Sequence, residues 1–282
     1  MFRRQLLEVW QLESALDVEW AHAIAPEARI ILVEGQATRD GLLDAVKVAI
    51  AKGADVISMS WGLPEFEDQT SLDRLFLADA AFVAAAGDEG NPALWPASSP
   101  SVTAVGGTKL LMNAEGNYSG ETAWDGSGGG LSTYELRPGY QAGFNPSTQR
   151  GIPDVAYNAD PNTGFAVYNS MPYFGSTGWL QVGGTSAGAP QWAALIAIVN
   201  SMRVQGNKSP LGKFLNGNFL LYGAATTSYN SNYHDITSGP KNGKCGSPCS
   251  ANPGYDYVTG LGSPQAGSPQ ANNLINALAN AP

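Results

Sequence analysis

The most constraining feature of this sequence is an alternation of strand-like and helix-like segments through its N-terminal part. Short apolar runs occur at Arg29–Val33, Asp55–Ser60, Ala81–Ala86 and Val102–Val105. Apolar residues at helical spacing lie before and between them, at Leu12–Ala25, Gly41–Ala51 and Leu72–Asp79. Strands that alternate with helices predict an α/β fold with a mostly parallel sheet covered by helices on both faces. Functional sites in such folds form at the carboxyl ends of the strands.

The rest of the chain adds no sign of a second domain. Further strands are predicted at Gly164–Tyr168 and Trp179–Val182, and a long apolar helix at Ala187–Asn200. The 282 residues, 43% of them hydrophobic, suffice for one core, and no repeat or linker divides them, so residues 1–282 are expected to form a single domain. The net charge of −9 argues against nucleic acid and membrane partners.

The segment Gln181–Pro190 has the pattern of a nucleophile turn. A strand ends in Gly183 and Gly184, which permit a tight turn, and Ser186 then opens an apolar helix. Free N–H groups and the helix dipole at that position favour developing negative charge. An ordinary N-cap serine would fit the same position, so this segment alone leaves both interpretations open.

The proton acceptor for such a serine is not expected to be a histidine. The sequence holds only His22 and His234, and His22 lies on a predicted helix without a glycine-rich context. Glu13 and Asp17, four residues apart, share one face of the first predicted helix. Two close carboxyl groups raise one pKa and share a proton, and so can serve a serine in acid. The alternative is a solvated acidic face.

Three separated motifs together resemble the sedolisin family of serine-carboxyl peptidases, of bacterial type. Residues 184–190 resemble its Gly-Thr-Ser-Ala-x-x-Pro motif, residues 13–19 its Glu-x-x-x-Asp-[Ile/Val]-Glu motif, and residues 85–90 its Ala-Ala-Gly-Asp-x-Gly motif. The likeness runs from about Leu12 to the C-terminus. It implies a three-layer, subtilisin-like fold.

The resemblance also implies an activity and its residues. The chain would be a serine-type endopeptidase that hydrolyses peptides or proteins at acidic pH through an acyl-enzyme on Ser186. Glu13 would be the general base and Asp17 would orient it. A protonated Asp88 would donate a hydrogen bond to the oxyanion. Two segments, Ser60-Trp61-Gly62 and Gly128-Gly129-Gly130, resemble those that line the family's substrate cleft, although simple loop chemistry would also explain them.

The C-terminal part resembles the calcium site of the family. Asp235 and Asp256 would give carboxylates, and Ile236, Asn252 and Gly254 would give backbone carbonyls to Ca²⁺. Acidic turns without a metal are the alternative.

Cys245 and Cys249 lie in one loop, where a short disulfide is preferred over free thiols. A disulfide indicates a secreted protein, although no signal peptide is visible in the sequence.

The resemblance departs from the family pattern at the N-terminus. Family members have more sequence before the motif of Glu13, including the first strand of the central sheet, whereas here only Met1 to Gln11 precede Leu12. We therefore expect an N-terminally truncated domain without that strand, and an exposed sheet edge that invites self-association. An impaired peptidase fragment, or an esterase-like hydrolase that uses Ser186, are the alternative functions.

Overall fold

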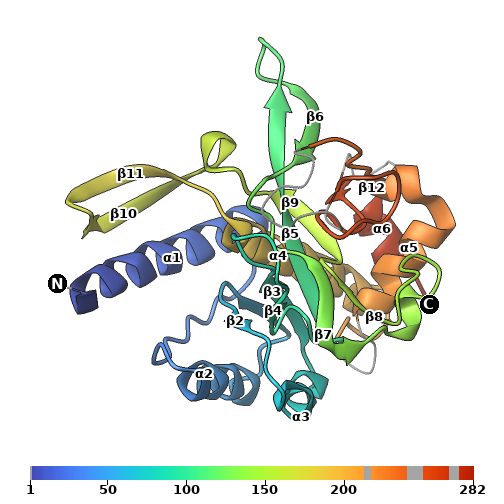
Figure 1. Cartoon of the computed structure of the whole chain (residues 1–282), viewed down its shortest axis with the longest axis horizontal. Coiled ribbons are helices and arrows are strands. Elements are labelled where there is room, and N and C mark those ends of the chain that lie inside the picture. The colour runs from blue at the N-terminus through green and yellow to red at the C-terminus, as the bar shows by residue number, and fades with distance from the viewer. Residues whose placement is uncertain (1, 213–216, 240–249, 267–272) are drawn as a thin grey trace.

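The centre of the structure is a mixed sheet whose parallel strands alternate with helices along the chain. The structure, a computed structural model, describes residues 2–212, 217–239, 250–266 and 273–282. Four strands lie parallel in the order β1 (Val56–Met59), β3 (Ala81–Ala85), β5 (Val102–Met112) and β9 (Val155–Asn158). The second half of β5 pairs antiparallel with β6 (Tyr118–Ala123), and this hairpin projects from the rest of the molecule (Figure 1).

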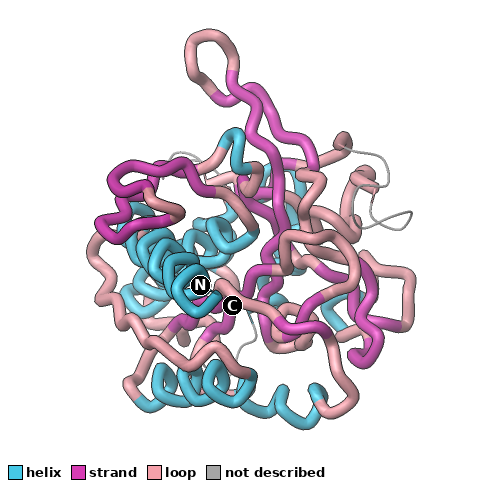
Figure 2. The backbone as a smooth tube through the Cα atoms, turned by 60° about the vertical axis from the view of Figure 1, so that its left-hand side comes forward, coloured by secondary structure: helices cyan, strands magenta, loops and turns pink. Residues whose placement is uncertain are grey.

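Helices and smaller strand pairs surround this sheet. The α-helices are α1 (Phe2–Ile24), α2 (Arg39–Ala51), α3 (Gln69–Leu72), α4 (Thr185–Gln205), α5 (Gly217–Asn232) and α6 (Leu274–Asn280). The 3₁₀ helices are η1 (Asp73–Leu77), η2 (Gly139–Gln141) and η3 (Pro161–Thr163). The antiparallel pairs are β2 (Leu63–Pro64) with β4 (Leu94–Trp95), β7 (Gly130–Leu136) with β8 (Gln149–Ile152), β10 (Phe165–Tyr173) with β11 (Ser176–Val182), and β12 (Tyr233–His234) with β13 (Ser263–Pro264). The β10–β11 hairpin lies along α1 (Figure 2).

The two faces of the sheet bury different hydrophobic clusters. On β3, Val83 belongs to the cluster that includes Trp192 of α4, whereas Phe82 and Ala84 belong to the cluster that includes Val46 of α2. This alternation follows from the two-residue period of a strand. The predicted α/β architecture of three layers, with helices on both faces, is therefore confirmed.

One predicted strand is absent. The apolar run Arg29–Val33 is assigned no strand, and Ile30 and Leu32 are exposed to 38% and 54%. Within the described residues β1 pairs with β3 alone, and the run 29–33 pairs with no strand. Strand propensity without a neighbour to accept the backbone hydrogen bonds does not make a strand, and the prediction for this segment was wrong.

Two other boundaries differ from the predicted ones. The predicted helix Leu72–Asp79 is a 3₁₀ helix, η1, that follows the single turn of α3. The strand predicted to stop before Gly106 and Gly107 continues through them to Met112. A Cβ at Gly106 would lie 2.6 Å from Pro153, and one at Gly107 would lie 2.7 Å from Trp124, so these glycines permit close packing and do not end the strand.

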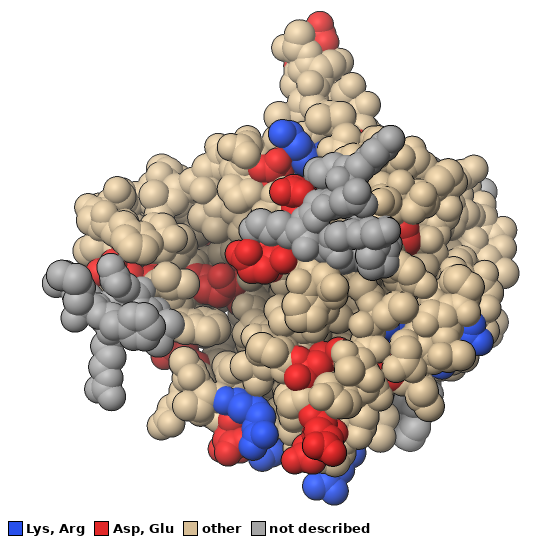
Figure 3. Space-filling view, viewed as in Figure 1, with Lys and Arg blue, Asp and Glu red and all other residues tan. Residues whose placement is uncertain are grey.

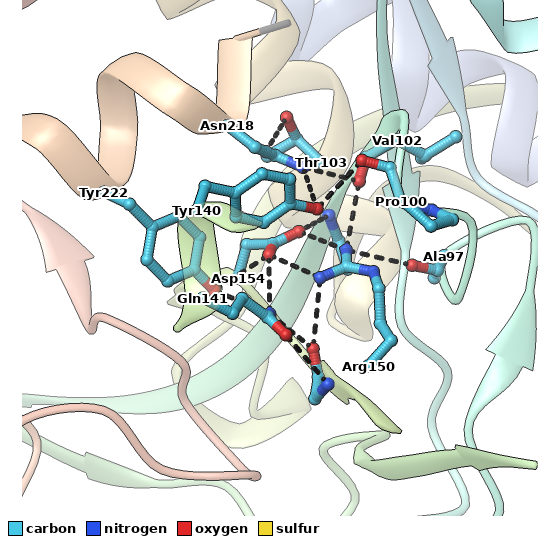
Figure 4. Close-up of polar contacts among 12 residues, drawn as sticks. Ala97, Pro100, Val102, Thr103, Tyr140, Gln141, Arg150, Asp154, Asn218 and Tyr222 are labelled. Atoms are coloured by element: carbon cyan, nitrogen blue, oxygen red, sulfur yellow. Dashed lines mark hydrogen bonds and ion pairs between the residues drawn. The ribbon is translucent and has the colours of Figure 1, made fainter. Parts of the chain in front are cut away.

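A fully buried ion pair joins the sheet to the segments around it. The two terminal nitrogens of Arg150 donate to the two carboxylate oxygens of Asp154 at 2.8 and 2.6 Å, and neither side chain is exposed to solvent (Figure 4). The Asp154 carboxylate also accepts from the Ala104 N–H of β5 at 2.8 Å and from the Tyr222 hydroxyl of α5 at 2.9 Å. Arg150 further donates to the Val102 carbonyl.

These contacts connect β5, the β8–β9 segment and α5 through one charge pair. A buried pair of this kind need not add net stability over apolar residues, but removing one partner leaves a charge uncompensated in the core.

Replacing one partner of this pair should therefore destabilise the fold strongly. We expect Asp154→Asn to lower the free energy of unfolding by about 3–5 kcal/mol, measured by urea unfolding. The matched control is Asp44→Asn, which breaks the exposed Lys47–Asp44 pair and should change stability by no more than about 0.5 kcal/mol. Equal losses in the two variants would contradict this interpretation.

Candidate active site

Packing of the first helix brings its two carboxyl groups to the start of α4. Leu12 and Leu16 of α1 are buried in a cluster with Ala187 of α4. Glu13 and Asp17 each follow one of these leucines, so they lie beside the same interface. The predicted shared face of Glu13 and Asp17 is thus directed toward the helix that carries the candidate nucleophile.

Ser186 lies in the first turn of α4, as the sequence predicted. β11 ends at Val182, and Gly184 adopts a φ of +102°, which a glycine adopts without strain. The Gly184 N–H donates to the Ala159 carbonyl at 2.7 Å, which ties the turn to the end of β9. The turn therefore holds the half-buried Ser186 at a helix N-terminus.

The hydroxyl of Ser60 joins the carboxyl pair to the nucleophile turn. It donates to Asp17 Oδ1 at 2.6 Å and also lies 3.3 Å from the Ser186 carbonyl. Ser60 follows β1, so it stands at the carboxyl end of a parallel strand, where functional groups are expected. The sequence predicted Ser60 as a cleft-lining residue and missed its contact with Asp17.

Both carboxyl groups of α1 hold protons more tightly than usual. The pKa of Glu13 is raised to about 8, first by burial and then by Asp17 and Asp88, while the Ser186 and Ser60 hydroxyls oppose the shift. Burial raises the pKa of Asp17 to about 7 against the effect of its hydrogen bond from Ser60. One oxygen of Glu13 is buried and accepts no hydrogen bond. Two buried carboxyl groups at this spacing favour a state in which at least one of them keeps its proton.

Asp88 is fixed to the residue that precedes the nucleophile. It follows β3 and Gly87, and its Oδ1 accepts from the Thr185 N–H at 2.7 Å and from the Thr185 hydroxyl at 2.8 Å. The Gly87 N–H donates to the same hydroxyl at 3.1 Å. Thr185 was not predicted as a site residue, and its place in the Gly-Thr-Ser motif was the only sequence signal for this role. The three predicted motifs therefore meet in one place.

The predicted glycine segment supports the Asp88 turn. The Gly128 N–H donates to the Gly87 carbonyl at 2.7 Å, and the Gly129 N–H donates to the Gly90 carbonyl at 3.2 Å. A Cβ on Gly128 would lie 2.3 Å from the Ala86 carbonyl oxygen, so only glycine fits there. These two amides are engaged within the protein, and a peptide would have to use other groups of Gly128-Gly129-Gly130.

The other predicted cleft segment lies against β4. Trp61 is partly buried, with its ring centroid 6.3 Å from that of Trp95, and a Cβ on Gly62 would lie 2.9 Å from Leu94. These contacts hold the segment Ser60-Trp61-Gly62 beside the carboxyl pair. Its role toward a substrate remains a prediction.

The residues predicted as calcium ligands converge on one turn. The Asp235 carboxylate accepts from the Gly254 N–H at 3.0 Å, and that of Asp256 accepts from the Asn252 N–H at 3.0 Å. Ile236 follows Asp235 and is buried. In the described part of the chain, no three His, Cys, Asp or Glu side chains cluster as metal ligands. A site here would depend on backbone carbonyls beside two carboxylates, which suits a hard cation.

Some predictions cannot be compared with the structure. Cys245 and Cys249 lie outside the described residues. Within the described residues, no helix has the length and apolar character needed to span a membrane.

Acidic side chains lie in and around the hollow of the face seen in Figure 3, and basic ones are fewer there. Surroundings of this charge favour the protonated form of a carboxyl group.

Comparisons with known proteins agree with this geometry. A sequence profile described as the Subtilase family matches residues 13–211. Kumamolisin from Bacillus sp. (strain MN-32) is 37% identical over 89% of this chain and 49% of its own length. Sedolisin from Pseudomonas sp. (strain 101) is 32% identical over 90% of this chain and 47% of its own. The chain thus spans about half the length of these curated relatives.

A solved structure shows the same fold. Pseudomonas sedolisin, a serine-carboxyl proteinase complexed with two molecules of pseudo-iodotyrostatin, aligns with a TM-score of 0.75 and 29% sequence identity. The alignment covers 89% of this chain and 75% of that one. The subtilisin-like α/β fold predicted from the motifs is confirmed.

The raised pKa values predict how stability depends on pH. Folding raises the pKa of Glu13 from 4.5 to about 8 and that of Asp17 from 3.8 to about 7. The contribution of these two groups to the free energy of unfolding is therefore fully present below the ordinary values and is lost as the pH rises through the raised ones. Each group should add up to about 1.4 kcal/mol per pH unit to this loss.

We expect the melting temperature to fall between about pH 4 and 9, and to fall less in Glu13→Gln. Glu27→Gln, at an exposed position after α1, is the control for charge removal. A Glu13→Gln curve parallel to that of the parent would show that Glu13 is not the group that titrates.

Proposed function

We propose that this chain, which belongs to the subtilase family and within it to the sedolisins, hydrolyses peptide bonds through an acyl-enzyme on Ser186. The observation that carries the proposal is the position of Ser186 at a helix N-terminus, between a proton-sharing carboxyl pair and the Asp88 turn. Glu13 and Asp17 supply that pair. We also propose that residues 1–282 form a single catalytic domain.

In the proposed acylation, Ser186 Oγ attacks the carbonyl carbon of the scissile peptide bond. Its proton passes to the ionised carboxylate of Glu13, whose pKa is affected by the Ser186 hydroxyl. Before this step Asp17, held by Ser60, keeps its proton, so that the pair carries a single negative charge, and after the step the pair is neutral. Glu13 then returns the proton to the leaving amine, and a water molecule repeats the sequence to hydrolyse the ester.

Asp88 is the proposed stabiliser of the oxyanion. A carboxylic acid that keeps its proton can donate a hydrogen bond to the tetrahedral intermediate. Thr185 engages Oδ1 of Asp88 with two hydrogen bonds, and this leaves Oδ2 to carry the proton. The N–H groups at the start of α4 add positive potential at the same place.

These protonation requirements set the proposed pH range. Activity requires the Glu13–Asp17 pair to lose one proton, so that Glu13 can accept that of Ser186. We propose activity in acidic solution from the resemblance to the sedolisins, and the raised pKa values of the pair shift the rising limb of the pH profile toward the neutral end of that range.

We propose peptide or protein substrates, bound in extended form between Ser60-Trp61-Gly62 and Gly128-Gly129-Gly130. Main-chain groups beside these glycines would pair with the substrate backbone. We also propose that the protein is secreted and acts outside the cell, because the disulfide predicted for Cys245 and Cys249 needs an oxidising compartment. The edge of β1 that pairs with no strand among the described residues is compatible with self-association of the chain.

Calcium is the proposed metal. Asp235 and Asp256 would hold it together with the carbonyls of Ile236, Asn252 and Gly254, because both carboxylates already contact the turn that carries two of these carbonyls. A bound Ca²⁺ would have a structural role and tie residues 235–236 to the turn.

The catalytic assignment is tested by single substitutions. Ser186→Ala should lower kcat/KM by about 10⁴-fold or more, and Glu13→Gln by a comparable factor, because each removes a group that acts as part of one unit. The measurement is cleavage of a denatured protein between about pH 3 and 8, where the parent should peak below about pH 7. Glu27→Gln is the matched control. Full activity of Glu13→Gln would contradict the assignment of Glu13 as the general base. An activity confined to ester substrates would favour an esterase.

The calcium site is tested through stability and needs no substrate. Chelation should lower the melting temperature of the parent, by an amount that corresponds to about 2.7 kcal/mol if calcium had been present at a hundred times its Kd. Asp235→Asn should remove the calcium dependence, whereas Asp125→Asn, at an exposed position, should retain it. A melting temperature unaffected by chelation in the parent would rule out the site.

A further inference from the structure

A second group of carboxyl side chains lies outside the catalytic pair. Glu65 follows β2, Asp73 begins η1, and Glu135 lies on β7. Glu65 and Glu135 contact Gln69, which is fully buried, and Asp73 interacts with Glu135. Together with Ser132 they form what we call the Gln69 cluster.

Hydrogen bonds in the Gln69 cluster cross between separate segments of the chain. Gln69 Nε2 donates to Glu65 at 3.0 Å and to Glu135 at 2.8 Å. The other oxygen of Glu65 accepts from the Thr133 N–H of β7 at 2.8 Å, and the Ser132 hydroxyl donates to Glu65 as well. The cluster therefore joins β7 to the β2–α3 segment.

One contact in the cluster brings two carboxyl groups together. Asp73 and Glu135 lie close enough for each to act on the pKa of the other, and two ionised carboxylates at such a contact repel each other. Asp73 is fixed on its other side by the Trp95 Nε1–H at 3.0 Å. Glu135 is only 5% exposed, so solvent does little to relieve a second negative charge there.

The two segments that the cluster joins continue directly into the two proposed walls of the substrate cleft. Glu65 comes three residues after Gly62, and Ser132 comes two residues after Gly130. The relative position of Ser60-Trp61-Gly62 and Gly128-Gly129-Gly130 thus depends in part on contacts within the cluster.

We propose that Glu65, Asp73 and Glu135 are positioning residues for the substrate cleft. A proton shared by Asp73 and Glu135 closes the Gln69 cluster and fixes the spacing of the two cleft walls. Loss of that proton places two like charges in contact and loosens β7 from the β2–α3 segment. Substrate binding is then confined to acid independently of the catalytic pair, a consequence that rests on the proposed function.

The direction of the effect follows from the groups that face Glu135. Burial raises the pKa of Glu135 to about 7, helped by Asp73 and Glu65 and opposed by the hydrogen bond from Gln69. Burial also raises the pKa of Asp73, and this shift is opposed by the hydrogen bonds from Trp95 and Ser99, by the contact with Glu135 and by the charge of Arg150. The cluster is closed below about pH 7 and opens above it, with the protonated fraction falling about tenfold per pH unit.

The test measures amide hydrogen exchange, which needs no substrate. The Thr133 N–H donates to Glu65, and the Glu135 N–H donates to Ser132 Oγ at 2.8 Å. We expect their protection, corrected for intrinsic exchange, to fall about tenfold between about pH 6 and 8 in the parent chain. Glu135→Gln keeps the shape and hydrogen bonds of the protonated acid, so the protection of the two amides should stay constant with pH in this variant. The same result is expected for Asp73→Asn.

Controls and kinetics separate this proposal from the proposed function. In the control variant Glu67→Gln, at an exposed position in the loop before α3, the amide protection should fall between about pH 6 and 8 as it does in the parent. With a peptide substrate, KM should rise about tenfold over the same range in the parent but not in Glu135→Gln, while the pH dependence of kcat stays unchanged. Constant protection in the parent, or an equal fall in Glu135→Gln, would overturn the proposal. If no variant cleaves peptides, the proposed function fails while the exchange result still decides the role of the cluster.

Discussion

The rest of the structure depends on how the core accommodates the charge of Arg150 and Asp154. An isolated buried ion is costly by several kcal/mol, and the protein offsets this by a two-pronged pair whose carboxylate is also bonded to Ala104 and Tyr222. Those bonds hold the start of β5 against the β8–β9 segment and α5. Since β5 pairs with β3, the same contacts also support the strand that leads to the Asp88 turn.

The candidate site solves the problem of buried charge in the opposite way. In the described residues no lysine or arginine forms an ion pair with Glu13 or Asp17, and burial raises the pKa of both groups. Burial likewise raises the pKa of both Asp73 and Glu135, where we propose a shared proton. Asp154 is thus neutralised by an arginine, whereas burial without a cationic partner favours the protonated form of Glu13 and Asp17.

Local patterns predicted much of the fold, and contacts distant in sequence explain the rest. Alternating periodicities indicated the layered sheet, and the glycine turn correctly put Ser186 at a helix start. The strand predicted at Arg29–Val33 failed because pairing depends on a neighbour that propensity does not reveal. The contact of Thr185 with Asp88 joins residues far apart in the chain, and no local pattern encodes it. The role of Gln69 was equally invisible, because a glutamine in a polar segment reads as solvated surface.

The separation of Glu13 and Ser186 along the chain has a consequence for biosynthesis. The proposed base lies on the first helix, whereas the nucleophile lies on α4, and the two meet only when the buried leucines of α1 pack against α4. A polypeptide still emerging from the ribosome therefore carries Glu13 long before Ser186 is added, and it holds the two groups apart until α1 packs against α4. The proposed hydrolytic machinery is thus inert until tertiary packing is complete, so newly made chains are protected from one another while they are most easily cut.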